Sequence, residues 1–217
     1  MHTLLNNLLD LLFPPRCAAC RSRGALFCAH CCARCRFVPA AANTEQHRRL
    51  NSPVLASTAG AYIFEGALRE ALHAFKYHRR ARLATPLGGL LAGYLAQHPC
   101  AVDALVPVPL HPSRIQQRGF NQSLLLAQAL AKHLHIPVLT TEVVRVRHTQ
   151  QQADLSRAQR RENVRNAFAW QGRQTAPRRI LIVDDVLTTG ATVEAVAQVL
   201  WNAGSREIHA LALARGL

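Results

Sequence analysis

The sequence predicts an α/β fold, in which a parallel sheet with flanking helices follows a small cysteine-rich segment. Two apolar runs, at residues 180–183 and 104–110, are typical of strands buried on both faces of such a sheet. Apolar residues at helical spacing follow, over residues 191–202 and 121–134. With 217 residues, the chain can form one such domain of roughly 150 residues together with a small appendage.

The apolar run at 180–183 leads into a pattern of polar residues that indicates a ligand site. Asp184 and Asp185 come where the strand should end, so they can accept hydrogen bonds from adjacent sugar hydroxyls. Gly190 lets backbone amides approach a phosphate, and a helix that begins after it points its positive end toward the same place. The alternative is an ordinary strand-turn-helix unit. The predicted ligand-binding residues are Asp184, Asp185, Val186, Leu187, Thr188, Thr189, Gly190, Ala191 and Thr192.

Six of the seven cysteines fall between Cys17 and Cys35 and form CxxC pairs. Two pairs separated by seven residues can place four thiolates tetrahedrally around Zn²⁺, whereas a disulfide framework fits an odd cysteine count poorly. The predicted zinc ligands are Cys17, Cys20, Cys28 and Cys31. Cys32, Cys35 and His30 remain alternative ligands.

Local patterns divide the chain into three parts. Residues 1–36 hold a short amphipathic helix and the cysteines, residues 37–53 have no sustained period and predict a linker, and residues 54–217 form the α/β domain. The first thirteen residues lack the basic start and the cleavage site of a targeting peptide. We therefore expect a cytoplasmic protein, with peripheral association at the inner membrane as an option.

The formal net charge of +14 is unusual, and only two of the 26 basic residues are lysines. Nine arginines lie between residues 145 and 179, against Asp154 and Glu162. Such a segment attracts polyphosphate or nucleic acid, although a solvated helical face is the ordinary alternative. The residues predicted to contact nucleic acid lie mostly on one face of an expected helix: Arg157, Arg160, Arg161 and Arg165.

The segment DDVLTTGAT resembles the phosphoribosyl pyrophosphate (PRPP) signature of the type I phosphoribosyltransferases. Further blocks occur in the order seen in the ComF/GntX family: FPPRCAAC, FKYHRRARLA, DALVPVPLHPSRIQQRGFNQS and RVRHTQQQADLSRAQRRENVRNAF. The resemblance implies a type I phosphoribosyltransferase-like domain. It also implies that Asp184 and Asp185 hold the ribose hydroxyls while residues 186–192 hold the 5-phosphate.

The resemblance also implies catalytic candidates and partners. Arg114 and Arg118 occupy the place of the pyrophosphate loop, and Mg²⁺ would accompany PRPP. Residues 145–168 are expected to cover the site, with Arg147, Thr149, Gln152 and Arg160 as the candidate residues, and the alternative is a surface helix with a structural hydrogen-bond network. Three functions remain open: a factor in DNA uptake that binds single-stranded DNA and works with a competence helicase or other uptake proteins, an active phosphoribosyltransferase, and a PRPP sensor without chemistry. The family commonly has about eight metal ligands, whereas the cysteine cluster of this chain stops at Cys35, so a second zinc is not expected.

Two further expectations concern single side chains. Lys76 follows a helical apolar stripe, so its stem can lie along the core or its ammonium can serve the site. Core packing is expected for the aromatic residues Tyr62, Tyr77, Phe120 and Trp170.

Overall fold

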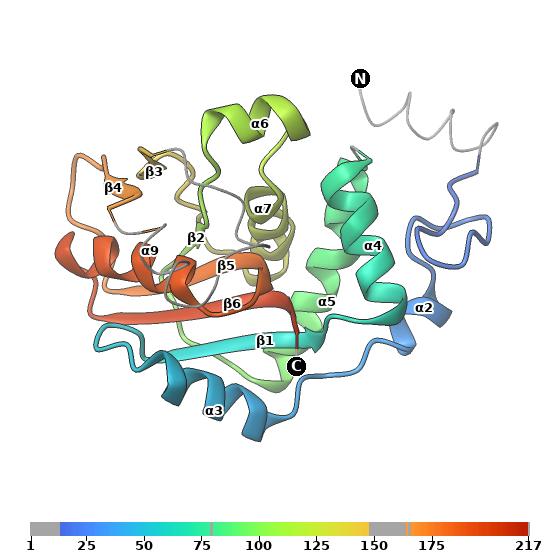
Figure 1. Ribbon diagram of the computed structural model, residues 1–217, viewed down its shortest axis with the longest axis horizontal. Coiled ribbons are helices and arrows are strands. Elements are labelled where there is room, and N and C mark those ends of the chain that lie inside the picture. Colours follow the sequence, from blue (N-terminus) through green and yellow to red (C-terminus); the bar gives the residue numbers. More distant parts are fainter. Residues whose placement is uncertain (1–13, 79, 148–163, 165, 217) are drawn as a thin grey trace.

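The computed structural model describes the chain except residues 1–13, 79, 148–163, 165 and 217 (Figure 1). Its strands are β1 (Ser57–Ile63), β2 (Ala104–Pro107), β3 (Val143–Arg145), β4 (Phe168–Trp170), β5 (Arg179–Leu187) and β6 (Glu207–Arg215). Its helices are α2 (Ala29–Ala33), α3 (Ala40–Leu50), α4 (Gly66–Tyr77), η1 (Ala81–Leu83), α5 (Ala84–Gln97), α6 (Pro112–Arg118), α7 (Gln122–Leu134) and α9 (Ala191–Asn202).

The centre of the molecule is a four-stranded parallel sheet in the order β1-β6-β5-β2. Alternate residues of its inner strands enter two separate apolar cores. On one face Leu181 and Val183 pack with α4, α5 and α7, and on the other Ile180 and Ile182 pack with α9. Because both faces are covered, the unbroken apolar run of β5 is buried throughout, as the sequence predicted (Figure 1).

The antiparallel pair β3–β4 forms a small second sheet. Strand β1 pairs in parallel with β6 at the edge of the main sheet. The expected strand at 180–183 continues to Leu187, so Asp184 and Asp185 lie within β5 rather than after it. The carboxyl end of the sheet therefore carries both carboxylates.

The expected linker at residues 37–53 was wrong in its middle, where helix α3 packs against β1. The side chain of Asn43 accepts from the Gly60 amide at 3.0 Å and donates to the Gly60 carbonyl at 3.1 Å. A guanidinium N–H of Arg215 donates to the carbonyl of Ala42 at 2.6 Å. Helix α3 is thus joined to the α/β domain by polar contacts, which a search for apolar periodicity does not detect.

Within the described residues, no helix is both long enough and apolar enough to cross a membrane. The amphipathic helix expected in the first thirteen residues lies outside the part that the structure describes.

Candidate functional site

A cavity of about 320 Å³ opens at the carboxyl end of the sheet. Parallel α/β sheets bind ligands at this end, because the loops that follow the strands converge there. The polar and charged residues that line it are Lys76, Tyr77, Arg114, Arg118, Gln122, Ser123, Arg145, Asp184, Asp185, Thr188 and Thr192. Phe64, Val108, Leu110, Val186, Leu187, Gly190 and Val193 complete the wall. The cavity therefore brings β5 together with α4, α6, α7, α9 and β3.

The two carboxylates are held by neighbours of different kinds. The hydroxyl of Ser123 donates to Asp184 Oδ1 at 2.9 Å, and the backbone amide of Asp185 donates to the same oxygen at 2.8 Å. The ammonium of Lys76 lies 2.9 Å from Asp185 Oδ1. Burial, and then the neighbouring Asp185 carboxylate, raise the pKa of Asp184 to about 7. Two carboxyl groups thus face the cavity: Asp185 is paired with a cation, and the pKa of Asp184 lies near neutral pH.

Helix α3 contacts the loop at residues 188–192 and holds it in place. The side-chain amide of Gln46 donates to the carbonyl of Thr189 at 3.0 Å. Gly190 has φ of +83° and precedes the first residue of α9. A Cβ there would stand 3.1 Å from both terminal methyls of Leu50. Glycine is required both for its left-handed backbone and for its close approach to α3, and it leaves the start of α9 open toward the cavity.

We expect Gly190→Ala to weaken both the fold and the site. The left-handed conformation costs roughly 1–2 kcal/mol for a residue with a Cβ, and Leu50 must also move. Chemical denaturation should show a loss of that order, and the affinity for phosphorylated ligands should fall because the loop is displaced. Gly89→Ala in α5 is the matched control: nothing lies within 4 Å of its Cβ, so a gain of about 0.5–1 kcal/mol is expected. Equal stability of the two variants would contradict the role of Gly190.

The RGFNQS segment links β2 to the carboxylates through α6 and α7. Gly119 ends α6 with φ of +87°, and Asn121 caps α7 by accepting from the amide of Ser123 at 3.0 Å. The side chain of Asn121 also donates to the carbonyl of Val108 at 3.0 Å, which ties the start of α7 to the chain after β2. This geometry places Ser123 against Asp184.

Arg118 and Gln122 form a second polar group in the wall. A guanidinium N–H of Arg118 donates to Gln122 Oε1 at 3.1 Å. Gln122 is 1% exposed, and among the described residues nothing accepts a hydrogen bond from its Nε2. A buried amide donor without an acceptor costs free energy, so a ligand oxygen at this wall would be favoured.

Arg145 is the main site residue that the sequence did not reveal. It ends β3, is 8% exposed, and places its guanidinium 5.2 Å from the ring centre of Phe168. Burial, and then the charge of Arg114, lower the pKa of Arg145 to about 10. Burial, and then the charge of Arg118, lower that of Arg114. Three arginines thus approach one cavity, which favours an anionic ligand.

The structure brings together most of the predicted ligand-binding residues. Arg114 and Arg118 line the same cavity as the two aspartates, whereas Thr189 and Ala191 do not line it. Arg147 is exposed and does not belong to the lining. The predicted residues outside the described part of the chain are Thr149, Gln152, Arg157, Arg160, Arg161 and Arg165. Gln122 and Ser123 were also missed, although their place in RGFNQS was a usable signal.

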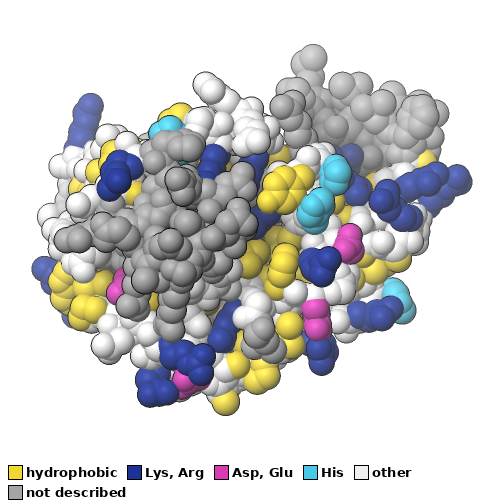
Figure 2. Space-filling view, in the orientation of Figure 1, with side chains coloured by type: hydrophobic (Ala, Val, Ile, Leu, Met, Phe, Trp, Pro, Cys, Tyr) yellow, Lys and Arg dark blue, Asp and Glu magenta, His cyan; other side chains and the backbone are white. Residues whose placement is uncertain are grey.

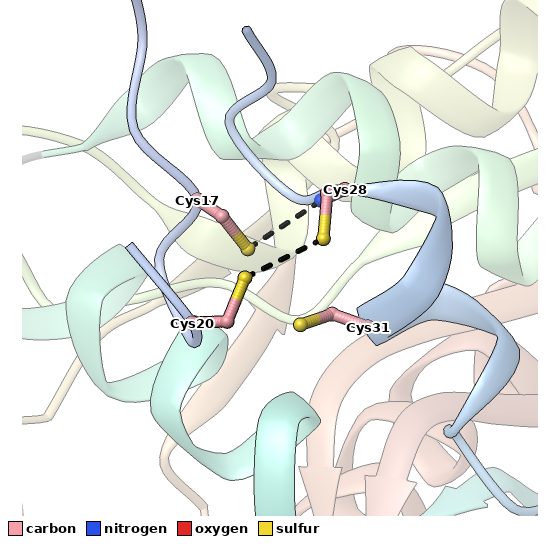
Figure 3. A group of neighbouring side chains, drawn as sticks. All are labelled: Cys17, Cys20, Cys28 and Cys31. Atoms are coloured by element: carbon pink, nitrogen blue, oxygen red, sulfur yellow. Dashed lines mark hydrogen bonds between the residues drawn. The ribbon is translucent and has the colours of Figure 1, made fainter. Parts of the chain in front are cut away.

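The four predicted zinc ligands form a separate cluster at the front of the chain. The sulfur atoms of Cys17, Cys20, Cys28 and Cys31 all lie within 4.8 Å of one another. Figure 3 shows the four side chains pointing toward a common centre from two adjacent segments. Tetrahedral Zn²⁺ with sulfur ligands at about 2.3 Å needs sulfurs about 3.8 Å apart, close to this arrangement. The donor set and its geometry therefore fit a metal such as zinc.

The local environment shifts the pKa values of two of these thiols in opposite directions. A hydrogen bond with the Ser22 hydroxyl lowers the pKa of Cys20 to about 6. Burial raises the pKa of Cys31. Cys32 and Cys35 instead direct their thiols toward the carbonyls of Phe27 and Cys31, at 3.8 and 3.4 Å, and stand outside the four-sulfur cluster.

Comparison with known proteins agrees with this architecture. Residues 121–217 match the phosphoribosyl transferase domain family. Competence protein F of Haemophilus influenzae is 44% identical over 115 residues, which are 52% of this chain and 50% of that protein. The DNA utilization protein YhgH of Escherichia coli is 37% identical over 155 residues, 69% of this chain and 68% of that protein. Competence protein ComFC of Bacillus subtilis is 26% identical over 197 residues, 87% of this chain and 78% of that protein.

The match to the Haemophilus protein thus spans half of that protein's length, whereas the match to YhgH covers more than two thirds of both chains. The parallel sheet, the cavity at its carboxyl end and the domain match all agree with one architecture. The chain therefore belongs to the ComF family, and its main domain has the phosphoribosyltransferase fold.

Proposed function

We propose that this protein binds PRPP in the cavity at the carboxyl end of the sheet and serves as a cytoplasmic factor in DNA uptake. The observation that carries the PRPP proposal is the convergence of two carboxylates, a threonine-rich loop and several arginines on one cavity. Each of these groups suits a different part of PRPP, and a separate DNA interface is a further part of the proposal.

The start of α9 supports placement of the 5-phosphate. Backbone amides at the first turn of a helix are free of intrahelical partners and favour an anion. The Thr188 and Thr192 side chains face the same space and can donate to phosphate oxygens. Asp184 and Asp185, a few residues earlier on β5, are then within reach of the ribose hydroxyls, which donate to carboxylate oxygens.

The arginines support placement of the pyrophosphate. Among the described lining residues, four cationic side chains stand against two carboxylates, which complements a polyanion. Guanidinium groups bind phosphate oxygens in pairs, so Arg114 and Arg118 suit the pyrophosphate, and Mg²⁺ would arrive with it. Gln122 can donate to a ligand oxygen through its unused Nε2.

The same arrangement suits transfer of the phosphoribosyl group. A nucleophile would form a bond to C1 of the ribose while the bond from C1 to pyrophosphate breaks, and the pyrophosphate would leave with the electron pair. Positive charge develops on the sugar beside Asp184 and Asp185, and negative charge develops on the leaving group beside the arginines. Binding without turnover would make the protein a PRPP sensor.

The names of its relatives and its charge support the DNA-uptake part of the proposal. One relative is called a competence protein and another a DNA utilization protein, and this chain carries a formal charge of +14. Sequence-independent binding to single-stranded DNA would follow from counterion release. The proposed DNA contacts are Arg157, Arg160, Arg161 and Arg165. The proposed protein partners are a competence helicase or other uptake proteins.

Titration calorimetry with PRPP and Mg²⁺ tests the ligand. We expect PRPP to bind more tightly than ribose 5-phosphate or pyrophosphate alone, because only PRPP occupies every part of the cavity. Release of pyrophosphate across a panel of bases and nucleic acids separates an enzyme from a sensor. Equal affinity for pyrophosphate alone and for PRPP would reduce the cavity to a general anion site.

The DNA-binding proposal is tested by measuring the affinity for single-stranded oligonucleotides at increasing salt concentration. The logarithm of affinity should fall with the logarithm of salt concentration, with a slope near 0.7 per phosphate neutralised. Replacing Arg157, Arg161 and Arg165, the proposed contacts that do not belong to the expected cover, by glutamate should lower DNA affinity and leave PRPP affinity unchanged. Stoichiometric competition between PRPP and DNA would instead show that DNA occupies only the anion pocket.

A further inference from the structure

Tyr77 does not pack in the core, contrary to the expectation for it. It is the last residue of α4, lines the cavity at its mouth and is 59% exposed. Phe75, two residues earlier, is fully buried, and its ring lies 5.3 Å from that of Phe120. Helix α4 thus places one aromatic ring in the core and presents another at the entrance of the ligand site.

Other groups around Tyr77 extend this surface. The guanidinium of Arg118 lies 5.6 Å from the centre of the Tyr77 ring. The ring of His73 lies 4.9 Å from that of Tyr77, and His78 lies 5.5 Å from His73. His73 and His78 do not line the cavity, so the row of rings continues outward from its mouth. Figure 2 shows histidine side chains over α4 beside hydrophobic and basic ones.

The aromatic rings and cationic groups of this surface indicate which kind of ligand it can bind. A planar ring with an arginine against it and further cations nearby favours a ligand that is aromatic and anionic at once. Lys76, Arg114 and Arg118 supply the positive charge around Tyr77. The bases of a duplex are stacked inside it, whereas the bases of a single strand are free to stack on protein side chains. A row of rings longer than the cavity suits several linked nucleotides better than one free base.

We propose that Tyr77, flanked by Arg118 and His73, is a stacking surface for the bases of single-stranded DNA at the mouth of the PRPP cavity. The proposal rests on the DNA-binding part of the proposed function and adds described residues to the contacts proposed at residues 157–165. Bases stack on the rings, while the phosphates that link them stay outside the cavity, where its positive charge attracts them without displacing the pyrophosphate. The strand therefore passes the entrance of the cavity in which PRPP is proposed to bind.

The test measures the binding of a fluorescein-labelled oligothymidylate to the full chain. Stacking of one base on an aromatic side chain contributes about 1–3 kcal/mol, so Tyr77→Ala should lower the affinity roughly five- to 150-fold. Tyr77→Phe is the matched control and should stay within about twofold, because it keeps the ring. The salt dependence should keep its slope in Tyr77→Ala, since the variant loses no phosphate contact. A local structural defect would not produce this combination.

Tyr77→Trp provides a direct readout, since a stacked base quenches indole fluorescence. The oligothymidylate should quench the added fluorescence after subtraction of the wild-type signal, and a duplex of equal length should quench it less. Unchanged affinity in Tyr77→Ala, or no quenching at saturation, overturns the proposal. Quenching by free adenine but not by the oligonucleotide would show that the ring binds a single base, and it would contradict the proposal that single-stranded DNA binds there.

The two proposals can fail separately. A wild-type protein that binds no single-stranded DNA removes both this surface and the DNA part of the proposed function, whatever the PRPP titration gives. A protein that binds DNA without dependence on the Tyr77 ring removes only the stacking surface.

Discussion

Replacing Asp184 and Asp185 together by asparagine should strongly weaken the binding of PRPP. Each buried hydrogen bond to the ribose contributes on the order of 1–3 kcal/mol, so the double variant should lose about thirtyfold in affinity or more. The fold should survive, because asparagine keeps the shape and Lys76 can return to solvent along its stem. Titration calorimetry of the folded variant measures the loss.

Asp103→Asn is the matched control for this experiment. Asp103 pairs with Arg179 at 2.6 Å, outside the lining of the cavity, so its loss should leave PRPP affinity unchanged. An unchanged affinity in the double variant at positions 184 and 185 would remove the carboxylate pair from the site and with it the central part of the proposed function.

The pH dependence of binding gives a second check on Asp184. Its pKa of about 7 lies above the usual value near 3.8, because burial and Asp185 disfavour the ionised form. If the ribose hydroxyls donate to the carboxylate, affinity should fall as pH decreases through about 7. Stability should change in the opposite direction: the contribution of the protonated carboxyl is complete below about 4 and is lost as pH rises through about 7. Asp184→Asn should therefore raise the melting temperature at pH 8 while it weakens binding.

The part of the site on β5 could be predicted because its pattern is local. The apolar run, the two carboxylates, the loop and the start of α9 are consecutive in the sequence, and each type of residue has its own reason to be there. The cysteine pairs were predictable for the same reason. Their spacing predicts two CxxC pairs that meet, and the structure selects Cys17, Cys20, Cys28 and Cys31 from the alternatives.

Helix α3 could not be predicted because its buried side chains are polar. Asn43, Gln46 and Leu50 follow helical spacing, but only Leu50 is apolar. The first two are buried because their polar groups find partners: Asn43 accepts from the Gly60 amide and donates to the Gly60 carbonyl, and Gln46 donates to the carbonyl of Thr189. Those partners lie far away in the sequence, so no local pattern indicates them.

Arg145 was missed as a site residue, and Tyr77 was wrongly expected in the core. In both cases the role of the side chain depends on its tertiary placement. Arg145 reaches the cavity only because β3 and β4 pair and place Phe168 against it. Tyr77 follows an apolar stripe that predicts burial, but α4 ends at this residue. A helical pattern predicts which side of a helix is buried, but not where the helix passes beyond its neighbours.

We propose that the four-cysteine cluster holds zinc, and its removal should produce the largest change in folding. Structural zinc sites built from thiolates contribute on the order of 10 kcal/mol to the folding of the segment that holds them. We expect one zinc per chain, and we expect Cys17→Ser with Cys20→Ser, or a strong chelator, to release it. Metal analysis and hydrogen exchange should show the loss and faster exchange over residues 14–36.

The effect should extend to α4 but leave the central sheet folded. Cys17, Phe27 and Cys31 belong to the same apolar core as Leu68 and Leu72 of α4. Arg36 pairs with Glu65 at 2.6 Å just before α4, and Arg80 donates to the carbonyl of Arg16 at 2.6 Å just after it. The cysteine segment thus holds both ends of the helix that carries Lys76 and Tyr77. Exchange should therefore also rise in α4, while the β5 amides remain protected.

Cys32→Ser with Cys35→Ser is the matched control, because these thiols face backbone carbonyls rather than the four-sulfur cluster. This variant should keep one zinc per chain and the wild-type exchange pattern. Loss of zinc from it, or an intact Cys17→Ser/Cys20→Ser protein that still holds one zinc, would assign the metal to a different set of ligands. Faster exchange in α4 in the metal-free protein, without any change in β5, would show that the cysteine segment supports the wall of the ligand cavity through this helix.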